Sequence, residues 1–189
     1  MKNIVLIGFM GTGKTSTGRS LAQRLGFSFL DLDQKIEAEA GMSIPEMFER
    51  CGEAYFRARE REMVARVAKR RNTVISTGGG TVKSQENMEA LRAGGVVVCL
   101  QADVDTILQR TMTQGQRPVL DGRDAGDRRK AIEQLMQERA QLYTHADYTV
   151  DTSNLSPLQV VDDIVRFLRA AMPAKVEAFE RTLGVTDGL

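Results

Sequence analysis

Near its start the chain reads Gly8-Phe9-Met10-Gly11-Thr12-Gly13-Lys14-Thr15. This octapeptide satisfies the pattern Gly-x-x-x-x-Gly-Lys-Ser/Thr and lies between an apolar run, Asn3 to Ile7, and a segment of helical period, Lys14 to Leu25. Such a loop binds phosphate, because its N–H groups and the N-terminus of the following helix point at phosphate oxygens. The sequence therefore predicts a nucleotide-binding loop. An accidental glycine-rich turn is disfavoured because strand, loop and helix are in register.

The residue types of this phosphate loop suit separate parts of a nucleotide site. Lys14 is expected to reach the β- and γ-phosphates, and the Thr15 hydroxyl is expected to ligate Mg²⁺. The residues expected to bind the phosphate groups are Gly11, Thr12, Gly13, Lys14, Thr15 and Ser16.

Short apolar runs rich in Val and Ile alternate along the chain with longer segments of helical period. This alternation predicts an α/β fold in which a parallel sheet lies between layers of helices. The expected strands are Asn3 to Ile7, Phe27 to Asp31, Thr73 to Ser76, Val96 to Leu100 and Tyr148 to Val150. The expected helices are Lys14 to Leu25, a short helix opened by the capping box Ser43 to Glu46, Glu53 to Lys69, Ser84 to Arg92, Val104 to Thr111, Asp127 to Tyr143 and Pro157 to Ala171.

The length of 189 residues fits a single domain, which we expect to span residues 1–172. Residues 113–127 contain three glycines and one proline without an apolar period, which is typical of a mobile lid over a site. Residues 173–189 are expected to form a tail, and the helical spacing of Val176, Phe179 and Leu183 favours a short helix there.

The charge and cysteine content exclude several classes of protein. The 26 Lys and Arg are offset by 25 Asp and Glu, which leaves no surplus positive charge to hold a nucleic acid. The longest apolar run, Val96 to Leu100, is far shorter than the roughly 20 residues of a membrane span. Cys51 and Cys99 lack disulfide or metal-site spacing and are expected in or near the core, whereas His145 is expected at the surface. These features predict a cytoplasmic protein without a nucleic-acid or membrane partner.

Acidic residues and a glycine triplet follow two further expected strands. Asp31 and Asp33 end the second strand, and Gly78 to Gly80 follow the third, at the sheet edge where ligands bind. If the strand stays extended, both carboxylates face one site, where one holds a Mg²⁺ water and the other takes a hydroxyl proton. Otherwise Asp33 caps the next helix. The glycines fit either a close approach of backbone to a ligand or a flexible turn.

The rest of the chain separates the classes of protein that carry a phosphate loop. The guanine-reading tetrapeptide Asn-Lys-x-Asp of a GTPase does not occur, and 189 residues are few for a motor. A small chain with a lid is typical of a small-molecule kinase, in which closure keeps water from the phosphoryl group. Sequence patterns do not choose among the arginines, each of which faces solvent by default: Arg57, Arg59, Arg61, Arg110, Arg117 and Arg139.

Taken together, these residues resemble the shikimate kinase family from Asn3 to about Ala171. The motifs that carry the resemblance are the phosphate loop extended by Ser16 to Arg19, Asp31-Leu32-Asp33, Phe56-Arg57 with Glu60, Gly78 to Gly80, Arg117-Pro118, and Arg139 with Leu142-Tyr143. The resemblance implies ATP-dependent phosphorylation of the 3-hydroxyl of shikimate, in the pathway to chorismate and the aromatic amino acids. It also implies a nucleoside-monophosphate-kinase-like fold with a five-stranded parallel sheet, a lid and a helical substrate-binding region.

The resemblance further implies roles for single residues. Asp33 resembles the acidic residue that binds the shikimate hydroxyls and acts as base. Arg57 and Arg139 resemble the pair that holds the shikimate carboxylate, with Gly79 and Gly80 beside them. The residues that resemble the ATP and Mg²⁺ machinery are Lys14, Thr15, Asp31, Arg117 and, against adenine, Arg110. The expected enzyme is thus a monomer that binds ATP, Mg²⁺ and shikimate, with the catalytic residues Lys14, Asp33 and Arg117.

Two alternatives stay open at this point. A related kinase of gluconate or of a nucleoside monophosphate would share the phosphate loop and lid but not the set formed by Asp33, Arg57, the glycine triplet and Arg139. A nucleotide-dependent binding module would hold an acidic ligand without turning it over. The presence of Lys14, Thr15 and Asp31 speaks against such a module.

Overall fold

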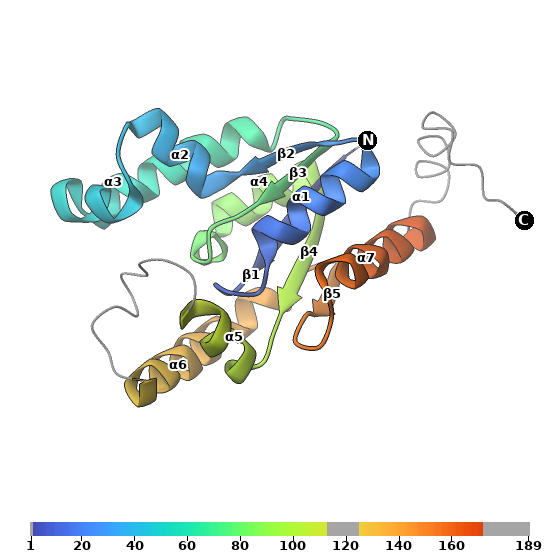
Figure 1. Cartoon of the computed structure of the whole chain (residues 1–189). Coiled ribbons are helices and arrows are strands. Elements are labelled where there is room, and N and C mark those ends of the chain that lie inside the picture. Colours follow the sequence, from blue (N-terminus) through green and yellow to red (C-terminus); the bar gives the residue numbers. More distant parts are fainter. Residues whose placement is uncertain (1, 113–124, 172–189) are drawn as a thin grey trace, which may run out of the picture.

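The computed structural model describes residues 2–112 and 125–171, which form a parallel sheet with helices on both faces (Figure 1). Its strands are β1 (Asn3–Gly8), β2 (Ser28–Asp31), β3 (Thr73–Ser76), β4 (Gly95–Gln101) and β5 (Tyr148–Asp151). Its helices are α1 (Lys14–Leu25), α2 (Leu32–Ala40), α3 (Ile44–Val67), the short 3-10 helix η1 (Thr81–Lys83), α4 (Gln85–Gly94), α5 (Val104–Met112), α6 (Ala125–Tyr143) and α7 (Pro157–Ala171). The predicted α/β fold with five parallel strands is confirmed.

The strand order β2-β3-β1-β4-β5 places β1 at the centre of the sheet. Leu6 of β1 and Asp31 of β2 both lie opposite Ser76 of β3. Because the strands run parallel, the segments that follow β1, β2 and β3 leave the sheet at one edge. This is the edge at which the sequence predicts ligand binding.

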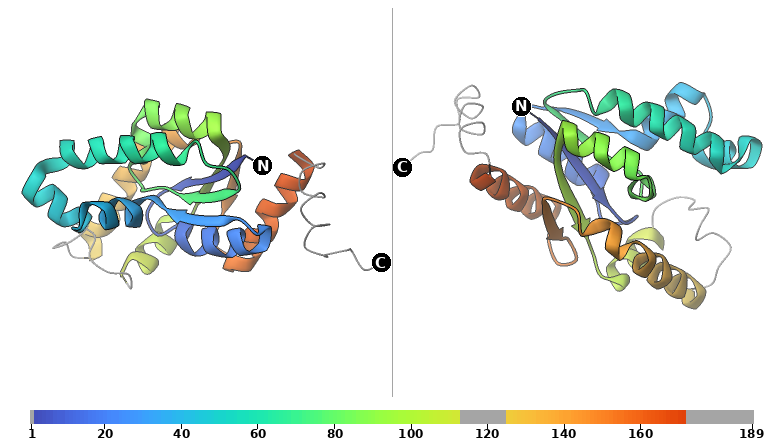
Figure 2. Two further views of the ribbon diagram at one scale, coloured as in Figure 1. Left: turned by 90° about the horizontal axis from the view of Figure 1, so that it is seen from above. Right: turned by 180° about the vertical axis from the view of Figure 1, so that it is seen from behind.

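The central strand β1 buries alternate side chains in two clusters on opposite faces of the sheet. Val5 and Ile7 belong to the cluster formed with α3 and α4, whereas Ile4 and Leu6 belong to the cluster formed with α1 and α7. Figure 2 shows α3 and α4 on one face of the sheet and α1 and α7 on the other. A third, smaller cluster joins Phe9 to α5 and α6. The phosphate loop therefore begins on a strand that is buried on both faces, as parallel sheets require.

Three helices differ from the sequence predictions. Helix α2 follows β2 directly and is not among the expected helices. Helix α3 runs through both helices expected between Ser43 and Lys69, with a break at Gly52, where φ is 80° and ψ is 164°. Helix α6 begins at Ala125, so the end of the predicted lid is wrong: Asp127 lies in the first helical turn, where its charge suits the helix dipole. Residues 113–124 of that lid and the expected tail 173–189 lie outside the described residues.

The predicted positions of the two cysteines and the single histidine are partly confirmed. Cys99 is buried in β4 and His145 is exposed, as predicted. Cys51 is exposed, so its expected place in or near the core is wrong. The reason is that α3 leaves the core before its break at Gly52, where only Met47 is fully buried. Of the helices that the structure describes, none has the length and apolar character that crossing a membrane would take.

Gly94, at the end of α4, packs against the backbone that follows α3. A methyl group on Gly94 would lie 2.1 Å from the carbonyl oxygen of Ala68. We therefore expect Gly94→Ala to lower the free energy of unfolding by about 1–3 kcal/mol, because one of the two backbones must move. Urea unfolding followed by circular dichroism measures this change. The exposed neighbouring change Ala93→Ser should alter it by only about 0.5 kcal/mol, and equal effects of the two variants would contradict the prediction.

Candidate active site

The phosphate loop has a backbone path that requires glycine at its first position. Gly8 has a φ of 143°, and a Cβ atom there would lie 2.2 Å from the carbonyl oxygen of Leu100. Lys14 Nζ donates hydrogen bonds of 2.9 Å to the carbonyl oxygens of Gly8 and Phe9. The phosphate loop itself therefore fixes the ammonium group of Lys14, which is predicted to bind the β- and γ-phosphates.

The two residues predicted to hold Mg²⁺ lie in contact. Thr15 Oγ1 donates a hydrogen bond of 2.7 Å to Asp31 Oδ2. Asp31 ends β2 and caps α2, where its Oδ1 accepts a hydrogen bond of 3.3 Å from the N–H of Gln34. A hydroxyl and a carboxylate so close together supply the hard oxygen ligands that Mg²⁺ prefers.

Asp33 lies in the first turn of α2 rather than on a strand, because the chain becomes helical at Leu32. The extended path considered for Asp31 and Asp33 is therefore wrong, and so is Asp33 as the helix cap, since Asp31 takes that role. Both carboxylates nevertheless line one cavity of about 460 Å³, together with the phosphate loop and the residues Thr77 and Gly79 after β3. The two carboxylates thus share one site as predicted, but they do so from the start of a helix rather than from an extended strand.

The Asp33 carboxylate is packed against Gly78. A Cβ atom on Gly78 would lie 2.5 Å from Asp33 Oδ1, and this buried oxygen has no hydrogen-bond partner among the described residues. Burial, together with the charges of Asp31 and Glu60, raises the pKa of Asp33 to about 6 against the opposing charge of Lys14. A carboxylate with such a pKa is suited to accept a hydroxyl proton near neutral pH.

Arg57 approaches the same glycine turn from α3. A Cβ atom on Gly80 would lie 2.9 Å from Arg57 Nη2. The guanidinium forms ion pairs of 3.0 Å with Glu53 and 2.9 Å with Glu60. Glu60 is only 1% exposed and accepts a hydrogen bond of 2.7 Å from Thr81 Oγ1. Although burial lowers the pKa of Arg57, the two carboxylates raise it, so the side chain remains a fixed cation.

Arg139 reaches the glycine turn from α6. It is 6% exposed, and its Nη1 donates a hydrogen bond of 2.9 Å to the carbonyl oxygen of Gly79. Its guanidinium lies 5.4 Å from the centroid of the Phe9 ring, and its Nε has no hydrogen-bond partner among the described residues. The turn Gly78–Gly80 therefore gathers Asp33, Arg57 and Arg139, the three side chains predicted to bind the acceptor.

Arg110 lies beside the phosphate loop. It donates hydrogen bonds of 3.3 Å to the carbonyl oxygen of Gly11 and of 3.1 and 2.9 Å to the hydroxyl and carbonyl oxygens of Thr152. This position agrees with a place near the nucleotide, while its predicted contact with adenine stays a prediction. Arg117 lies outside the described residues, so its predicted role is likewise a prediction.

Four residues shape the site without an individual role in the sequence predictions, although Gly78 and Glu60 belong to the motifs named there. Gly78 makes room for Asp33, Phe9 lies against Arg139, and the Arg57 guanidinium is held by Glu53 and Glu60. The helical spacing of the two glutamates from Arg57 is a signal that could have identified them. The contacts of Gly78 and Phe9 join segments far apart in the chain, so the sequence carries no local signal for them.

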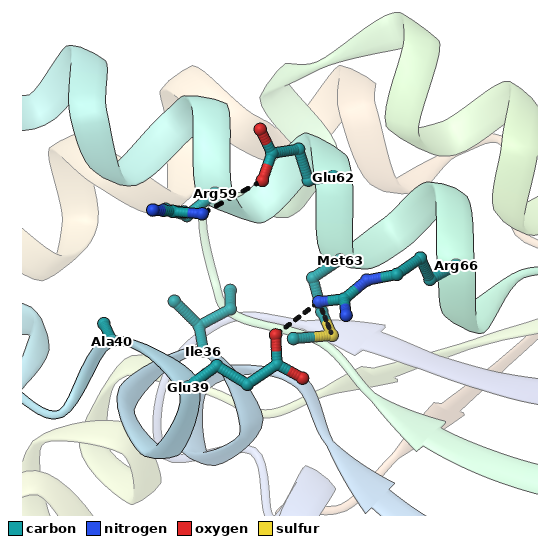
Figure 3. A pocket seen from close by; sticks show the side chains of 7 residues that line it. All are labelled: Ile36, Glu39, Ala40, Arg59, Glu62, Met63 and Arg66. Carbon is teal, nitrogen blue, oxygen red and sulfur yellow. Dashed lines mark hydrogen bonds and ion pairs between the residues drawn. The ribbon is translucent and has the colours of Figure 1, made fainter.

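A smaller pocket of about 90 Å³ lies between α2 and α3, outside this site (Figure 3). Its charged side chains pair with one another, Arg66 with Glu39 and Arg59 with Glu62. The pocket belongs to the packing between two helices, of which α2 carries the acid of the site and α3 carries one of its arginines.

Comparison with known proteins places these features in a family. The family model described as shikimate kinase matches residues 10–169. Curated shikimate kinases of Thermodesulfovibrio yellowstonii and Geobacter metallireducens are each 45% identical to this chain, over 166 and 168 residues. The matches cover 88% and 89% of this chain, and 94% and 92% of those proteins.

Solved structures agree with this assignment. The shikimate kinase of Acinetobacter baumannii, solved in complex with shikimate, is 36% identical with a TM-score of 0.85, covering 91% of this chain and 95% of that one. The shikimate kinase of Aquifex aeolicus is 33% identical with a TM-score of 0.76, covering 90% of this chain and 98% of that one. The resemblance drawn from the motifs is therefore confirmed, and the chain belongs to the shikimate kinase family.

Proposed function

We propose that this chain transfers the γ-phosphoryl group of ATP to the 3-hydroxyl group of shikimate. The observation that carries the proposal is the arrangement of Asp33, Arg57 and Arg139 around the turn Gly78–Gly80, next to the phosphate loop. Shikimate offers a carboxylate to the two arginines and a hydroxyl group to the acid. A kinase of gluconate or of a nucleoside monophosphate would need the phosphate loop but not this set of residues.

Arg57 and Arg139 bind the carboxylate of the acceptor. They come from α3 and α6, and both guanidinium groups lie against the turn Gly78–Gly80. Guanidinium groups suit this role because they bind a carboxylate through paired hydrogen bonds and keep their charge when partly buried. The backbone of Gly79 and Gly80 borders the acceptor because no side chain there stands in the way.

Asp33 accepts the proton of the attacking hydroxyl group. The hydroxyl oxygen forms a bond to the γ-phosphorus while the bond from this phosphorus to the β–γ bridging oxygen breaks, and ADP leaves with that electron pair. The hydroxyl proton passes to the Asp33 carboxylate, whose Oδ1 has no hydrogen-bond partner among the described residues. The transfer is direct, without a phosphorylated enzyme intermediate.

The phosphate loop binds the triphosphate of ATP through the backbone of Gly11, Thr12 and Gly13 and through the side chain of Ser16. Lys14 stabilises the negative charge that grows on the β–γ bridging oxygen. Arg110 binds adenine, and Arg117 stabilises the charge on the transferred phosphoryl group.

Thr15 and Asp31 are the residues that would hold Mg²⁺. Their oxygens lie 2.7 Å apart and are of the type that this ion prefers. When bound, Mg²⁺ neutralises charge on the transferred phosphoryl group.

We also propose that the chain acts as a monomer in the cytoplasm and has no nucleic-acid partner. The formal net charge of +1 supports the last point, because no positive surplus attracts a polyanion. Cys51 and Cys99 are both free thiols, which agrees with a reducing compartment.

An assay of ADP release over a panel of acceptors tests the proposed function. We expect turnover with shikimate and at most about a hundredth of that rate with gluconate or a nucleoside monophosphate, because neither holds a carboxylate and a hydroxyl group at the fixed separation that the shikimate ring sets. Lys14→Met should lower kcat for shikimate at least about a hundredfold, because it removes a cation from the transition state. Near-normal turnover by this variant would contradict the role of the loop. Binding of shikimate and ATP without ADP release would favour the non-catalytic binding module.

The two arginines should control acceptor binding selectively. Arg57→Ala and Arg139→Ala should each weaken shikimate binding roughly thirty- to several-thousand-fold, equivalent to about 2–5 kcal/mol, because each removes a partly desolvated charge partner. Isothermal titration calorimetry measures this, and the affinity for ATP should change less than about threefold. Arg59→Ala is the matched control, since Arg59 is exposed on the same helix. Equal losses for ATP and shikimate would contradict this map of the site.

Protonation of Asp33 should set the acid limb of the pH profile. The pKa of Asp33 is raised to about 6, so kcat/KM for shikimate should fall about tenfold per pH unit below that value. Asp33→Asn should lower kcat at least about a hundredfold at pH 7 and above, because the amide cannot accept the proton, and this difference should shrink as wild type itself loses activity below pH 6. The matched control Asp31→Asn should instead raise the Mg²⁺ concentration needed for half-maximal activity.

The same group gives a second, independent readout in stability. Because the folded pKa lies above the ordinary value of 3.8, ionisation of Asp33 costs stability as the pH rises through the window between these values. Asp33→Asn should therefore be more stable than wild type at about pH 8, and this gain should vanish at about pH 3. In the activity assays, the roles of the two aspartates would have to be exchanged if Asp33→Asn raised the Mg²⁺ concentration needed for half-maximal activity and kept the acid limb of the wild-type pH profile.

A further inference from the structure

Phe9, the second residue of the phosphate loop, has its ring in the protein interior. It is 2% exposed and packs in a cluster with Ala102 after β4, Ile107 of α5, and Ala131 and Ile132 of α6. Because these neighbours are themselves buried, the ring has little room to move independently of them. The ring therefore connects the phosphate loop mechanically to α6, the helix that carries Arg139.

Arg139 lies directly over this ring. The distance of 5.4 Å from the guanidinium carbon to the ring centroid is within the range of a cation–π contact. Arg139 Nη1 also donates a hydrogen bond of 2.9 Å to the carbonyl oxygen of Gly79. Together, these two contacts set the directions in which the remaining N–H groups of Arg139 point.

The two acceptor arginines are held in different ways. Arg57 is fixed by ion pairs with Glu53 and Glu60. Within the described part of the chain, Arg139 forms no such ion pair. Its neighbour Tyr143 is uncharged at neutral pH, and burial raises the pKa of that hydroxyl further, to about 12, against the opposing charge of Arg139. The orientation of Arg139 therefore depends on uncharged groups, of which the Phe9 ring is the one that belongs to the nucleotide site.

The backbone of Phe9 takes part in that nucleotide site. Its carbonyl oxygen accepts hydrogen bonds of 2.9 Å from Lys14 Nζ and 2.8 Å from Thr12 Oγ1. A nucleotide bound in a phosphate loop draws the lysine ammonium group to its β- and γ-phosphates, so this carbonyl must then share or lose a donor. One residue thus contacts the phosphate-binding lysine with its backbone and the carboxylate-binding arginine with its side chain.

We infer that Phe9 is a positioning residue that couples nucleotide binding to acceptor binding by orienting Arg139. This inference rests on the proposed function, because it takes Arg139 as a ligand of the shikimate carboxylate. Nucleotide at the loop adjusts Phe9, and the ring carries this adjustment to the guanidinium group. By linkage, the nucleotide and the acceptor each raise the affinity for the other by the same factor.

The test is isothermal titration calorimetry of the full chain with shikimate, alone and with saturating Mg²⁺ and a non-hydrolysable ATP analogue. For wild type we expect a lower shikimate Kd with the analogue, and the ratio of the two Kd values measures the coupling. Phe9→Leu keeps an apolar side chain but removes the aromatic face. It should raise the Kd measured with the analogue by about three- to thirtyfold and bring the ratio close to one.

Two further variants separate coupling from a loss of packing. A difluorinated phenylalanine at position 9 keeps the shape of the ring and weakens its negative face, so its ratio should lie between those of wild type and Phe9→Leu. Ile107→Val removes one methyl group from the same cluster and leaves the ring over Arg139 intact. It should lower the melting temperature but leave the ratio unchanged.

Each outcome has a defined meaning. A wild-type ratio in Phe9→Leu or in the fluorinated variant would overturn the inference, and so would an equal loss of the ratio in Ile107→Val. If the inference fails in this way but the wild-type chain binds shikimate, the proposed function still stands. A wild-type chain that does not bind shikimate at all would overturn the proposed function, and the inference with it.

Discussion

The site depends on the backbone pairing of β1 with β3. The carbonyl oxygen of Leu6 accepts hydrogen bonds of 3.1 and 3.0 Å from the N–H and hydroxyl groups of Thr77. This contact ties the turn after β3 to the strand that carries the phosphate loop. On the other side of β3, Asp31 lies opposite Ser76, so the start of α2 is held in the same register. The separations within the site are therefore set mainly by the sheet, which is rigid because it is buried on both faces.

The glycine turn shows why a functional site costs stability. Side chains at Gly78 and Gly80 would collide with the carboxylate of Asp33 and the guanidinium of Arg57. Glycine is the residue that loses most backbone freedom on folding, and the raised pKa of Asp33 means that its charge opposes folding at neutral pH. Under the proposed function, both costs fall where the substrate approaches the backbone and a proton is accepted, and strained features persist at such places in enzymes.

The charges of the site act on more than one partner. Burial and the charge of Asp31 are the main causes of the raised pKa of Asp33, and Glu60, which holds Arg57 through an ion pair of 2.9 Å, adds to them, whereas Lys14 lowers this pKa. The acid that orients one arginine thus also contributes to the basicity of Asp33. Because Glu60 is buried and accepts a hydrogen bond from Thr81, this double role has a fixed geometry.

From the sequence alone one obtains the strands, the phosphate loop and most helices, because these depend on residues close together in the chain. The parallel order of the strands also brings Asp33 to the correct edge. Charge and periodicity did not distinguish Arg57 from Arg59, since both belong to one charged helix, and only the family resemblance singled out Arg57. Packing of α3 places Arg57 against the glycine turn, whereas Arg59 Nε donates a hydrogen bond of 3.2 Å to the hydroxyl oxygen of Tyr55 on the same helix. Cys51 was misplaced for the same reason: burial and site contacts depend on distant segments, whose positions only the tertiary structure decides.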